Sequence, residues 1–309
     1  DAAVHALVQR LGAEKVSTDE AARREYFDDI TESPGRLPDA VVHAREVADV
    51  QTVMRIANEH RVPVIPVVAN YNVGGLAIAD RGGNVLDLKA MNRIIEVNED
   101  DLYLVIEPGV TTGDVRKHLD AHHPGVRIGY SFAPPTTSLI ANALMDGLTN
   151  LSLREGPTGD WVNGVEVVLP SGELVRTGLG QIGPWCSHSP LPRLESLFIN
   201  FHGCTGVVTK LALQCFPQRR YRKRMFVLAH DVDHAYALLR IVAGFMFSIH
   251  GAQKILGVLG DASQRPEPWS QLWIGGIIEL FGGLAIMVGL MTRPAAFLCS
   301  GTMAVAYLQ

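Results

Sequence analysis

The chain has 309 residues, a formal net charge of −5 and 19% charged residues. This length exceeds what one hydrophobic core usually holds, so we expect two domains. Lysine and arginine form no basic stripe interleaved with aromatic side chains, which argues against nucleic acid as a partner. Apolar residues are unevenly spread: residues 1–233 are typical of a water-soluble α/β sequence, whereas 241–309 carry few charges.

The first elements in chain order predict a mixed sheet covered by helices. Apolar residues at helical spacing predict a helix over 2–12, with Gly12 as its C-cap. Strands are expected at 38–44 and 62–67, with an amphipathic helix at 47–61 between them. This order gives a β-α-β unit.

A loop of small residues follows the second strand, in the stretch VANYNVGGLAIADRGGNVLDL. Gly74 and Gly75 let main-chain N–H groups point at an anion, so that phosphate can bind without a lysine. The side chain of Asn72 is not needed for that contact. For a glycine pair taken alone, a plain turn is the alternative.

Further segments follow this loop in order: VLDLKAMNRIIEVNEDDLYLVIEPGV, PPTTSLIANALMDG, GDWVNGVEVVLPSGELVRTG and LFINFHGCTGVVTKLALQCFP. With the loop, they resemble the FAD-binding domain of the vanillyl-alcohol oxidase and p-cresol methylhydroxylase superfamily, over residues 10–233. The similarity is greatest to the branch of the glycolate oxidase and D-lactate dehydrogenase flavin subunits. The resemblance implies an α+β FAD-binding fold of the PCMH type, FAD as cofactor, and oxidation of a small hydroxy acid or alcohol by hydride transfer to FAD.

The resemblance also implies cofactor-binding residues in four segments. The diphosphate loop, in which the family's run of three glycines is replaced here by valine, alanine and asparagine, contributes Pro66, Val68, Ala69, Asn70, Tyr71, Asn72, Val73, Gly74, Gly75 and Leu76. The segment beside the flavin contributes Pro135, Thr136, Thr137, Ser138, Asn142 and Gly147. The family pattern R-x-G-x-x-x-D-x-V is matched by Arg154, Gly156, Asp160 and Val162. The last segment, which passes the adenine and the isoalloxazine in the family, contributes Gly203, Gly206, Val208 and Thr209. Singly, each segment fits a turn or strand end; together, in the right order, they favour an FAD site.

The sequence identifies no catalytic base. Covalent flavin attachment is not expected, because the diphosphate loop holds no histidine and Tyr71 there suits packing. His122 and His123 follow a helix, where imidazoles suit the dipole of its C-terminus.

A metal site is not expected either. Cys186, His188, His202 and Cys204 form a mirrored pair that could in principle bind zinc, but one intervening residue is an awkward ligand spacing. Ordinary packing is the favoured interpretation. The cysteines form no CxxC pair and no secretory signal is visible, so we expect reduced thiols.

The stretch RRYRKRMFVLAHDVDHAYALLR begins like the substrate-covering cap domain of the family. It provides one strand and part of a helix, too little apolar surface for such a lid. We therefore expect an FAD-binding domain at 1–220, a truncated cap start or junction at 221–240, and membrane helices at 241–309. The acid or base that the cap often supplies in the family would then be missing.

The last third predicts transmembrane helices. Residues 241–260 and 271–291 are long enough, at ~1.5 Å per residue, to cross a hydrocarbon core of ~30 Å. Residues 294–309 cover only ~24 Å and look cut short. The phrases HGAQK and GLMTRPAA resemble the DoxX family of integral membrane proteins, from about residue 236 onward. That family has four helices, so we expect about three here, with membrane lipid as a partner and a quinone or a redox subunit as a possible electron acceptor.

The distribution of basic residues predicts the orientation. Basic side chains flank the ends of the spans on one side, at Arg219, Arg220, Arg222, Lys223, Arg224, Arg240 and Arg293, whereas the loop 261–270 contains one arginine. By the positive-inside rule the FAD domain should face the cytoplasm.

The first span also carries a polar cluster. His250, Gln253 and Lys254 stand at i, i+3 and i+4 on one helix face. Glu279 falls at a similar depth in the second span, so a Lys254–Glu279 pair is expected. Ionisable groups at such depth are costly and are paired or functional, which leaves two interpretations: a proton or quinone site, and a structural ion pair.

Three functional hypotheses follow. The first is an FAD-dependent dehydrogenase that passes electrons toward the membrane. The second is a non-catalytic membrane interaction or assembly module with a cofactor-binding domain. The third is a composite chain with two incomplete halves.

Overall fold

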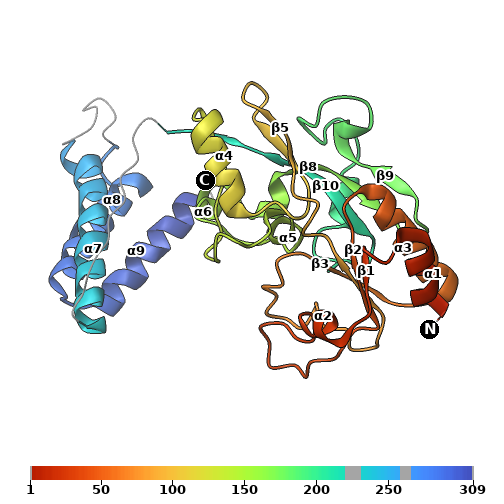
Figure 1. Cartoon of the computed structure of the whole chain (residues 1–309). Helices are drawn as coiled ribbons and strands as arrows, with labels where there is room; N and C mark the ends of the chain where they lie inside the picture. Colours follow the sequence, from red (N-terminus) through yellow and green to blue (C-terminus); the bar gives the residue numbers. More distant parts are fainter. Residues whose placement is uncertain (1, 220–230, 258–265, 308–309) are drawn as a thin grey trace. The chain divides into compact units, whose positions relative to one another are not determined.

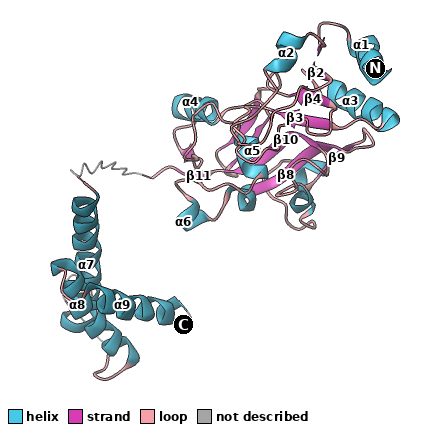
Figure 2. Cartoon of the chain, turned by 90° about the horizontal axis from the view of Figure 1, so that it is seen from below, coloured by secondary structure: helices cyan, strands magenta, loops and turns pink. Residues whose placement is uncertain are grey.

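The computed structural model describes residues 2–219, 231–257 and 266–307, with side chains in the last helix described as far as residue 302. The chain divides into two compact units, Asp1–Arg220 and Tyr221–Gln309. The first contains the sheets and the second consists of helices (Figures 1 and 2). Residues 220–230, where the strand that opens the cap is expected, lie outside the described residues, as does the first half of the loop expected at 261–270 between the first two spans.

A four-stranded sheet carries the β-α-β unit in the order β1-β2-β4-β3. Its strands are β1 (Val16–Ser17), β2 (Ala40–His43), β3 (Val64–Val67) and β4 (Asn84–Asp87). β4 runs parallel to both β2 and β3, and β1 is antiparallel to β2. Parallel strands need a long crossover connection, and α3 (Val47–His60) provides it between β2 and β3. The helix and both strands of the predicted unit are therefore confirmed, with each strand slightly shorter than expected.

Two helices bury one face of this sheet. α1 (Ala2–Leu11) and α3 lie side by side, and their apolar residues Leu7, Val50 and Val53 are almost completely buried against β2 and β4. Gly12 ends α1 with φ +92°, a conformation that glycine adopts without strain. The short α2 (Glu20–Arg24) is capped by the carboxylate of Asp19.

A five-stranded antiparallel sheet forms the second layer of the first unit, in the order β5-β6-β10-β8-β9. Its strands are β5 (Ile94–Asn98), β6 (Tyr103–Ile106), β8 (Val162–Val168), β9 (Leu174–Arg176) and β10 (Val207–Gln214). A separate pair joins β7 (Val126–Arg127) to β11 (Phe216–Pro217). The main core lies between this sheet and two helices, α4 (Thr112–His122) and α5 (Leu139–Leu144). The remaining short elements are α6 (Ser152–Glu155) and the 3-10 helices Thr158–Trp161, Gly178–Gln181 and Leu194–Leu197.

One carboxylate is fully buried in the five-stranded sheet. Glu166 lies between valines of β8 that face the core, and its oxygens are 2.8 Å from Arg176 Nε and 2.9 Å from Lys210 Nζ. The hydroxyl of Thr209 also donates to it, at 3.1 Å. Burial by itself raises the pKa of Glu166, but the two cations and their hydrogen bonds outweigh burial and hold the pKa below its ordinary value.

The second unit consists of α7 (Val232–Leu256), α8 (Gln271–Val288) and α9 (Thr292–Tyr307). α7 starts well before the span expected at 241–260, because Asp231 caps it, and it ends at Leu256, where Gly257 adopts φ +65°. α7 and α8 pack through glycines: a Cβ on Gly251 would lie 2.2 Å from Leu280 N, and one on Gly244 would lie 2.5 Å from Gly283 O. By length and composition, α7 and α8 could each cross a membrane.

Candidate functional site

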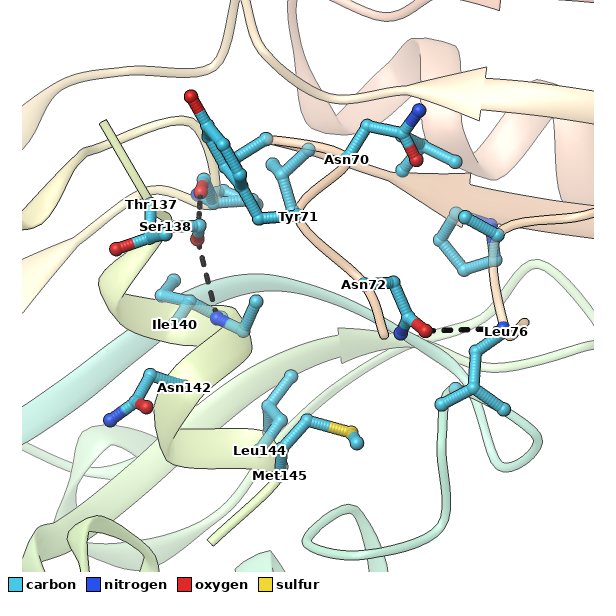
Figure 3. A pocket seen from close by; sticks show the side chains of 18 of the residues that line it. Asn70, Tyr71, Asn72, Leu76, Thr137, Ser138, Ile140, Asn142, Leu144 and Met145 are labelled. Atoms are coloured by element: carbon cyan, nitrogen blue, oxygen red, sulfur yellow. Dashed lines mark hydrogen bonds between the residues drawn. The ribbon is translucent and has the colours of Figure 1, made fainter. Parts of the chain in front are cut away.

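A cavity of about 430 Å³ lies in the first unit, within the size range of small-molecule sites. It is enclosed by the loop after β3, by α5 and by the segment that leads into β10 (Figure 3). The structure brings together here fourteen of the residues predicted to bind cofactor: Pro66, Val68, Ala69, Asn70, Tyr71, Asn72, Val73, Leu76, Thr137, Ser138, Asn142, Gly203, Gly206 and Val208. Three of the four predicted segments therefore share one cavity.

The loop after β3 is shaped by one of its own side chains. Asn72 Oδ1 accepts hydrogen bonds from Gly74 N at 2.7 Å and from Leu76 N at 3.3 Å, and Figure 3 draws the second of these. The main-chain oxygen of Asn72 accepts from Ile30 N at 3.0 Å. Gly75 has φ +73°, whereas Gly74 does not have a left-handed backbone. The conformational need for glycine therefore falls on Gly75.

Asn70 explains how the loop forms without the family's glycine run. Its φ is +53°, the left-handed region, which asparagine enters more easily than most other residues with a side chain. Its amide nitrogen donates to Asp28 O at 3.2 Å. Its buried Oδ1 has no hydrogen-bond partner within the protein. An unpartnered buried acceptor on a residue of the cavity wall suits a ligand that carries a donor group.

The segment before α5 forms the opposite wall (Figure 3). Ser138 caps α5: its hydroxyl accepts from Ala141 N at 3.2 Å and donates to Pro108 O at 2.7 Å. Thr137 donates its hydroxyl to Pro134 O at 2.8 Å. Thr136, outside the cavity lining, donates to the phenol oxygen of Tyr71 at 2.9 Å and so links the two walls. Pro135 O accepts from Gly113 N at 2.8 Å, which anchors this segment to α4.

Gly147, the last predicted residue of the segment beside the flavin, supports the cavity from outside. A Cβ on Gly147 would lie 2.2 Å from Asn142 Oδ1, so a side chain there would force the Asn142 amide to move. Thr158 donates its hydroxyl to Gly147 O at 2.8 Å. The four residues predicted in the third segment, Arg154, Gly156, Asp160 and Val162, do not line the cavity, so their cofactor role stays a prediction.

In the fourth segment, glycines bring the backbone close to other chain segments. Gly203 has φ +79°, and a Cβ there would lie 3.4 Å from Pro66 Cγ in the cavity wall. Gly206 has φ +156°, and a Cβ there would lie 2.6 Å from Val167 Cγ1. Thr209 is fully buried beside Glu166, away from the cavity.

Sequence reasoning missed part of the lining. Apolar side chains of α5 face the cavity, and the missed residues are Val67, Ala77, Leu88, Pro108, Ser131, Ala133, Ile140, Ala141, Leu144, Met145, His202 and Val207. Ile140 and Leu144 stand one helical turn apart in the predicted flavin segment, and this spacing could have identified them as further lining residues. His202 was considered only as a zinc ligand; here its Nδ1 lies 3.2 Å from Met145 Sδ. Within the described residues, no group of three or more His, Cys, Asp or Glu side chains could hold a metal ion.

The electrostatics of the cavity are those of a neutral site. Among its described lining residues there is no Asp, Glu, Lys or Arg. In the described part of the chain, the N–H groups of Ala69, Tyr71 and Val73 donate to no protein acceptor. Such free main-chain donors are what a diphosphate requires in the absence of a cation. The free donors, the unpartnered Asn70 Oδ1 and the apolar wall of α5 together fit an FAD molecule.

The predicted polar cluster of the second unit is partly assembled. Lys254 Nζ lies 2.7 Å from Glu279 Oε1, while Glu279 Oε2 is buried without a hydrogen-bond partner. His250 is exposed and its Nδ1 lies 3.2 Å from Gln253 Oε1. The structure thus joins the lysine and the glutamate across α7 and α8, and it pairs the histidine with the glutamine.

Comparisons with known proteins agree with this division of the chain. Residues 38–178 match the FAD binding domain family, and residues 235–309 match DoxX. The glycolate oxidase subunit GlcD of Bacillus subtilis (strain 168) is 30% identical over 234 residues, which is 74% of this chain and 48% of that protein. D-2-hydroxyglutarate dehydrogenase of Stutzerimonas stutzeri (strain A1501) is 28% identical over 79% of this chain and 53% of its own length. The chain therefore spans about half the length of these relatives.

A solved structure shows the same fold for the first unit. p-Cresol methylhydroxylase with substrate bound aligns with a TM-score of 0.64 at 23% identity, over 82% of this chain and 49% of that one. The order of segments, the cavity that they enclose and the family matches lead to one assignment. The chain belongs to the PCMH-type FAD-binding family over its first unit, and continues into a DoxX segment.

Proposed function

We propose that the first unit is the flavin half of an oxidoreductase that oxidises a small hydroxy acid or alcohol by hydride transfer to FAD. The observation that carries the proposal is the neutral cavity between the loop after β3, α5 and the segment leading into β10. The printed names of the relatives, glycolate oxidase and D-2-hydroxyglutarate dehydrogenase, support a 2-hydroxy acid as the substrate class.

The residues of the cavity have distinct tasks in this proposal. Bound FAD would supply the hydride acceptor. The N–H groups of Ala69, Tyr71 and Val73 would hold the diphosphate, and Asn70 Oδ1 would accept from a hydroxyl or amino group of the cofactor. Ile140 and Leu144 would exclude water from the apolar ring system. The hydrogen bond between Thr136 and Tyr71 would keep the two walls at a fixed spacing.

We also propose that the second unit anchors the flavin domain to a membrane and that a quinone or a redox subunit takes up its electrons. The DoxX match and the length of α7 and α8 support the anchor. The basic residues near the span ends, including Arg240 and Arg293, support a cytoplasmic flavin domain. The proposed domain limits remain 1–220, 221–240 and 241–309.

Purified full-length chain in detergent tests the flavin proposal. A yellow protein with bands near ~370 and ~450 nm is expected, and these bands should bleach when glycolate, D-lactate or D-2-hydroxyglutarate is added without oxygen. p-Cresol serves as the comparison substrate. A colourless protein that takes up no added FAD would overturn the cofactor assignment. A yellow protein bleached by p-cresol alone would overturn the substrate class.

A non-catalytic membrane module is the second candidate. It is favoured by the absence of any carboxylate, lysine or arginine among the described lining residues, since such groups often serve as acids or bases. A protein that retains FAD, is bleached by dithionite and is bleached by no hydroxy acid or alcohol would support this candidate instead.

The orientation has its own test. Cys204 is exposed, whereas Cys215 and Cys299 are buried. In a Cys186→Ser background, a membrane-impermeant maleimide should label Cys204 in inverted vesicles and not in intact spheroplasts. The reverse pattern would place the flavin domain on the outer side.

A further inference from the structure

We infer that His202 is the proton acceptor for the substrate hydroxyl, an inference that rests on the oxidoreductase function proposed above. Oxidation of an alcohol by hydride transfer releases a hydroxyl proton, and a positioned base speeds such a step. Among the described residues that line the cavity, only His202 has a side chain that ordinarily titrates near neutral pH. It is therefore the one group in that lining suited to take the proton at physiological pH.

The contact with Met145 fixes which ring nitrogen is basic. His202 Nδ1 lies 3.2 Å from Met145 Sδ. A thioether sulfur carries no hydrogen and can only accept, so Nδ1 must be the donor in this contact. In the neutral imidazole the other nitrogen, Nε2, then carries the free lone pair. The sulfur thus selects the tautomer whose Nε2 can accept a proton.

The backbone holds the imidazole in place at a conformational cost. His202 has φ +53°, Asn200 has φ +61° and Gly203 has φ +79°, so three of four neighbouring residues are left-handed. Asn200 N donates to Leu144 O at 2.7 Å, which ties this turn to the end of α5. Left-handed backbone at residues other than glycine persists where surrounding contacts impose it, and it is concentrated at functional sites.

Few other titratable groups face this region. Tyr71 lines the cavity from the loop after β3. Near the end of α5, the carboxylate of Asp146 accepts from Gly159 N at 3.1 Å, and on the same turn as His202 the Cys204 thiol is exposed. None of these three has a hydrogen bond to His202 in the described part of the chain. Among the described residues, Met145 Sδ is therefore the one hydrogen-bond partner of the His202 side chain.

The proposed step balances as follows for a 2-hydroxy acid. The hydroxyl O–H bond breaks and its proton passes to His202 Nε2. The C–H bond on the same carbon breaks, its electron pair passes with hydrogen to FAD, and a C=O bond forms. The products are a 2-oxo acid, two-electron-reduced FAD and an imidazolium, which returns its proton to solvent.

The test exploits the left-handed backbone. Glycine suits φ +53°, so His202→Gly removes the imidazole without adding backbone strain. Asn200→Gly is the matched control, because it also replaces a left-handed residue by glycine, two residues away and outside the cavity lining. Met145→Leu keeps a similar volume and removes the sulfur acceptor. Each full-length variant is purified with FAD, and single-turnover flavin reduction by a 2-hydroxy acid is followed from pH 5 to 9.

In the unsubstituted chain and in Asn200→Gly, the reduction rate should rise with pH in one step, as the imidazole loses its proton and becomes a base. His202→Gly should lose this rise and react about 100-fold or more slowly, while retaining FAD, and added imidazole should restore part of the rate. Met145→Leu should react a few-fold more slowly. A second readout does not involve turnover: diethylpyrocarbonate should modify His202 Nε2, and a 2-oxo acid product should protect it.

The outcomes separate the two proposals. If the unsubstituted chain is reduced but His202→Gly keeps the same rate and pH profile, the histidine assignment is wrong and the oxidoreductase function stands. If His202→Gly is slow but imidazole restores nothing and no 2-oxo acid protects the histidine, a structural role replaces the proton-accepting one. If no hydroxy acid or alcohol reduces the unsubstituted chain, the oxidoreductase function and this inference both fall.

Discussion

The side-chain oxygen of Asn72 lies 2.7 Å from the main-chain nitrogen of Gly74 and 3.3 Å from that of Leu76. One side chain thus closes the loop on which the proposed diphosphate contacts depend. The sequence suggested that the glycine pair mattered and that the Asn72 side chain did not. The structure instead divides the importance between Asn72, which holds the loop, and Gly75, whose φ of +73° disfavours any side chain.

Substitutions in this loop should therefore rank in a definite order of FAD affinity. Gly75→Val should weaken FAD binding most, because a β-branched residue resists φ +73° and its Cβ would lie 3.2 Å from Ser33 Oγ. Asn72→Ala should weaken it about 5- to 150-fold, because two hydrogen bonds of the loop are lost at ~0.5–1.5 kcal/mol each. Gly74→Ala is the control: its Cβ would lie 3.5 Å from Asn72 Oδ1, an ordinary contact.

Quenching of FAD fluorescence on titration with apoprotein measures these affinities. Gly74→Ala should bind FAD within about twofold of the unsubstituted chain, since surface changes of this kind cost less than ~0.5 kcal/mol. An Asn72→Ala variant as tight as the control would show that the loop keeps its shape without the asparagine.

The buried carboxylate of Glu166 should make the first unit sensitive to acid. Its pKa is lowered in the folded chain, so its contribution to stability is present above the unfolded pKa of about 4.3 and is lost as the pH falls through the folded value. Glu166→Gln should lower the free energy of unfolding by about 3–5 kcal/mol at pH 7, because Lys210 and Arg176 lose their buried partner; partial exposure of both cations favours the lower figure. The difference between the two proteins should shrink below pH 4.

Urea unfolding followed by tryptophan fluorescence can isolate this effect. Two of the four tryptophans, Trp161 and Trp185, belong to the first unit, so Trp269→Phe and Trp273→Phe leave only its signal. Glu155→Gln is the control, because Glu155 pairs with an exposed Arg154 and such pairs contribute less than ~1 kcal/mol. If both variants lose the same free energy of unfolding, the buried ion pairs of Glu166 stabilise the fold no more than an exposed pair does.

The interface between α7 and α8 predicts a contrast between two glycines. A Cβ on Gly251 would lie 2.2 Å from Leu280 N, whereas one on Gly275 would meet nothing within 4 Å. Gly251→Ala should force the helices apart and lower the melting temperature of the helical unit. Gly275→Ala should leave it unchanged or raise it, since alanine favours a helix by ~1 kcal/mol over glycine. Circular dichroism of the detergent-solubilised chain measures both, and a harmless Gly251→Ala would contradict the close helix contact.

Features of the fold and of the candidate site could be predicted from the sequence where they depend on residues close together in the chain. The β-α-β unit at 38–67 follows from local periodicity and is found. The contact between His202 and Met145 joins residues far apart in the chain, so no local pattern announces it. Glu166 lies in the run VEVV, where its alternation predicts an exposed face, but Arg176 and Lys210 from neighbouring strands allow it to be buried. Only the folded register of three strands reveals that compensation.

The contact between Lys254 and Glu279 was partly predictable from the sequence. The helical rise per residue places both side chains at a similar depth, so the sequence predicts a possible contact but not its geometry. In the structure, Lys254 Nζ lies 2.7 Å from Glu279 Oε1. Asn70 is a different kind of lesson: the lost glycine run implied a changed loop, yet asparagine supports the left-handed backbone at φ +53°. The shape of this loop therefore depends less on its glycine content than on the ability of asparagine to adopt a left-handed backbone.

The pair of Lys254 and Glu279 gives the sharpest test of the second unit. Glu279 is 5% exposed, and removal of one partner leaves an uncompensated charge among apolar helices, which costs about 3–5 kcal/mol if the site is fully buried. Lys254 is about one-third exposed, so a smaller loss is expected for Glu279→Gln than for Lys254→Met. Both single variants should lower the melting temperature or the detergent-extracted yield. The double variant should recover much of the loss, because no unpaired charge remains.

His250→Ala separates function from structure in the same helix. His250 is exposed and contacts Gln253, so its removal should leave the melting temperature unchanged. A role in proton or quinone chemistry predicts normal stability with impaired electron transfer to a soluble quinone analogue, whereas a packing role predicts lost stability.

If the double variant of Lys254 and Glu279 is as damaged as the sum of the two single variants, the residues are not energetically coupled, and the contact seen between α7 and α8 carries no stabilising pair.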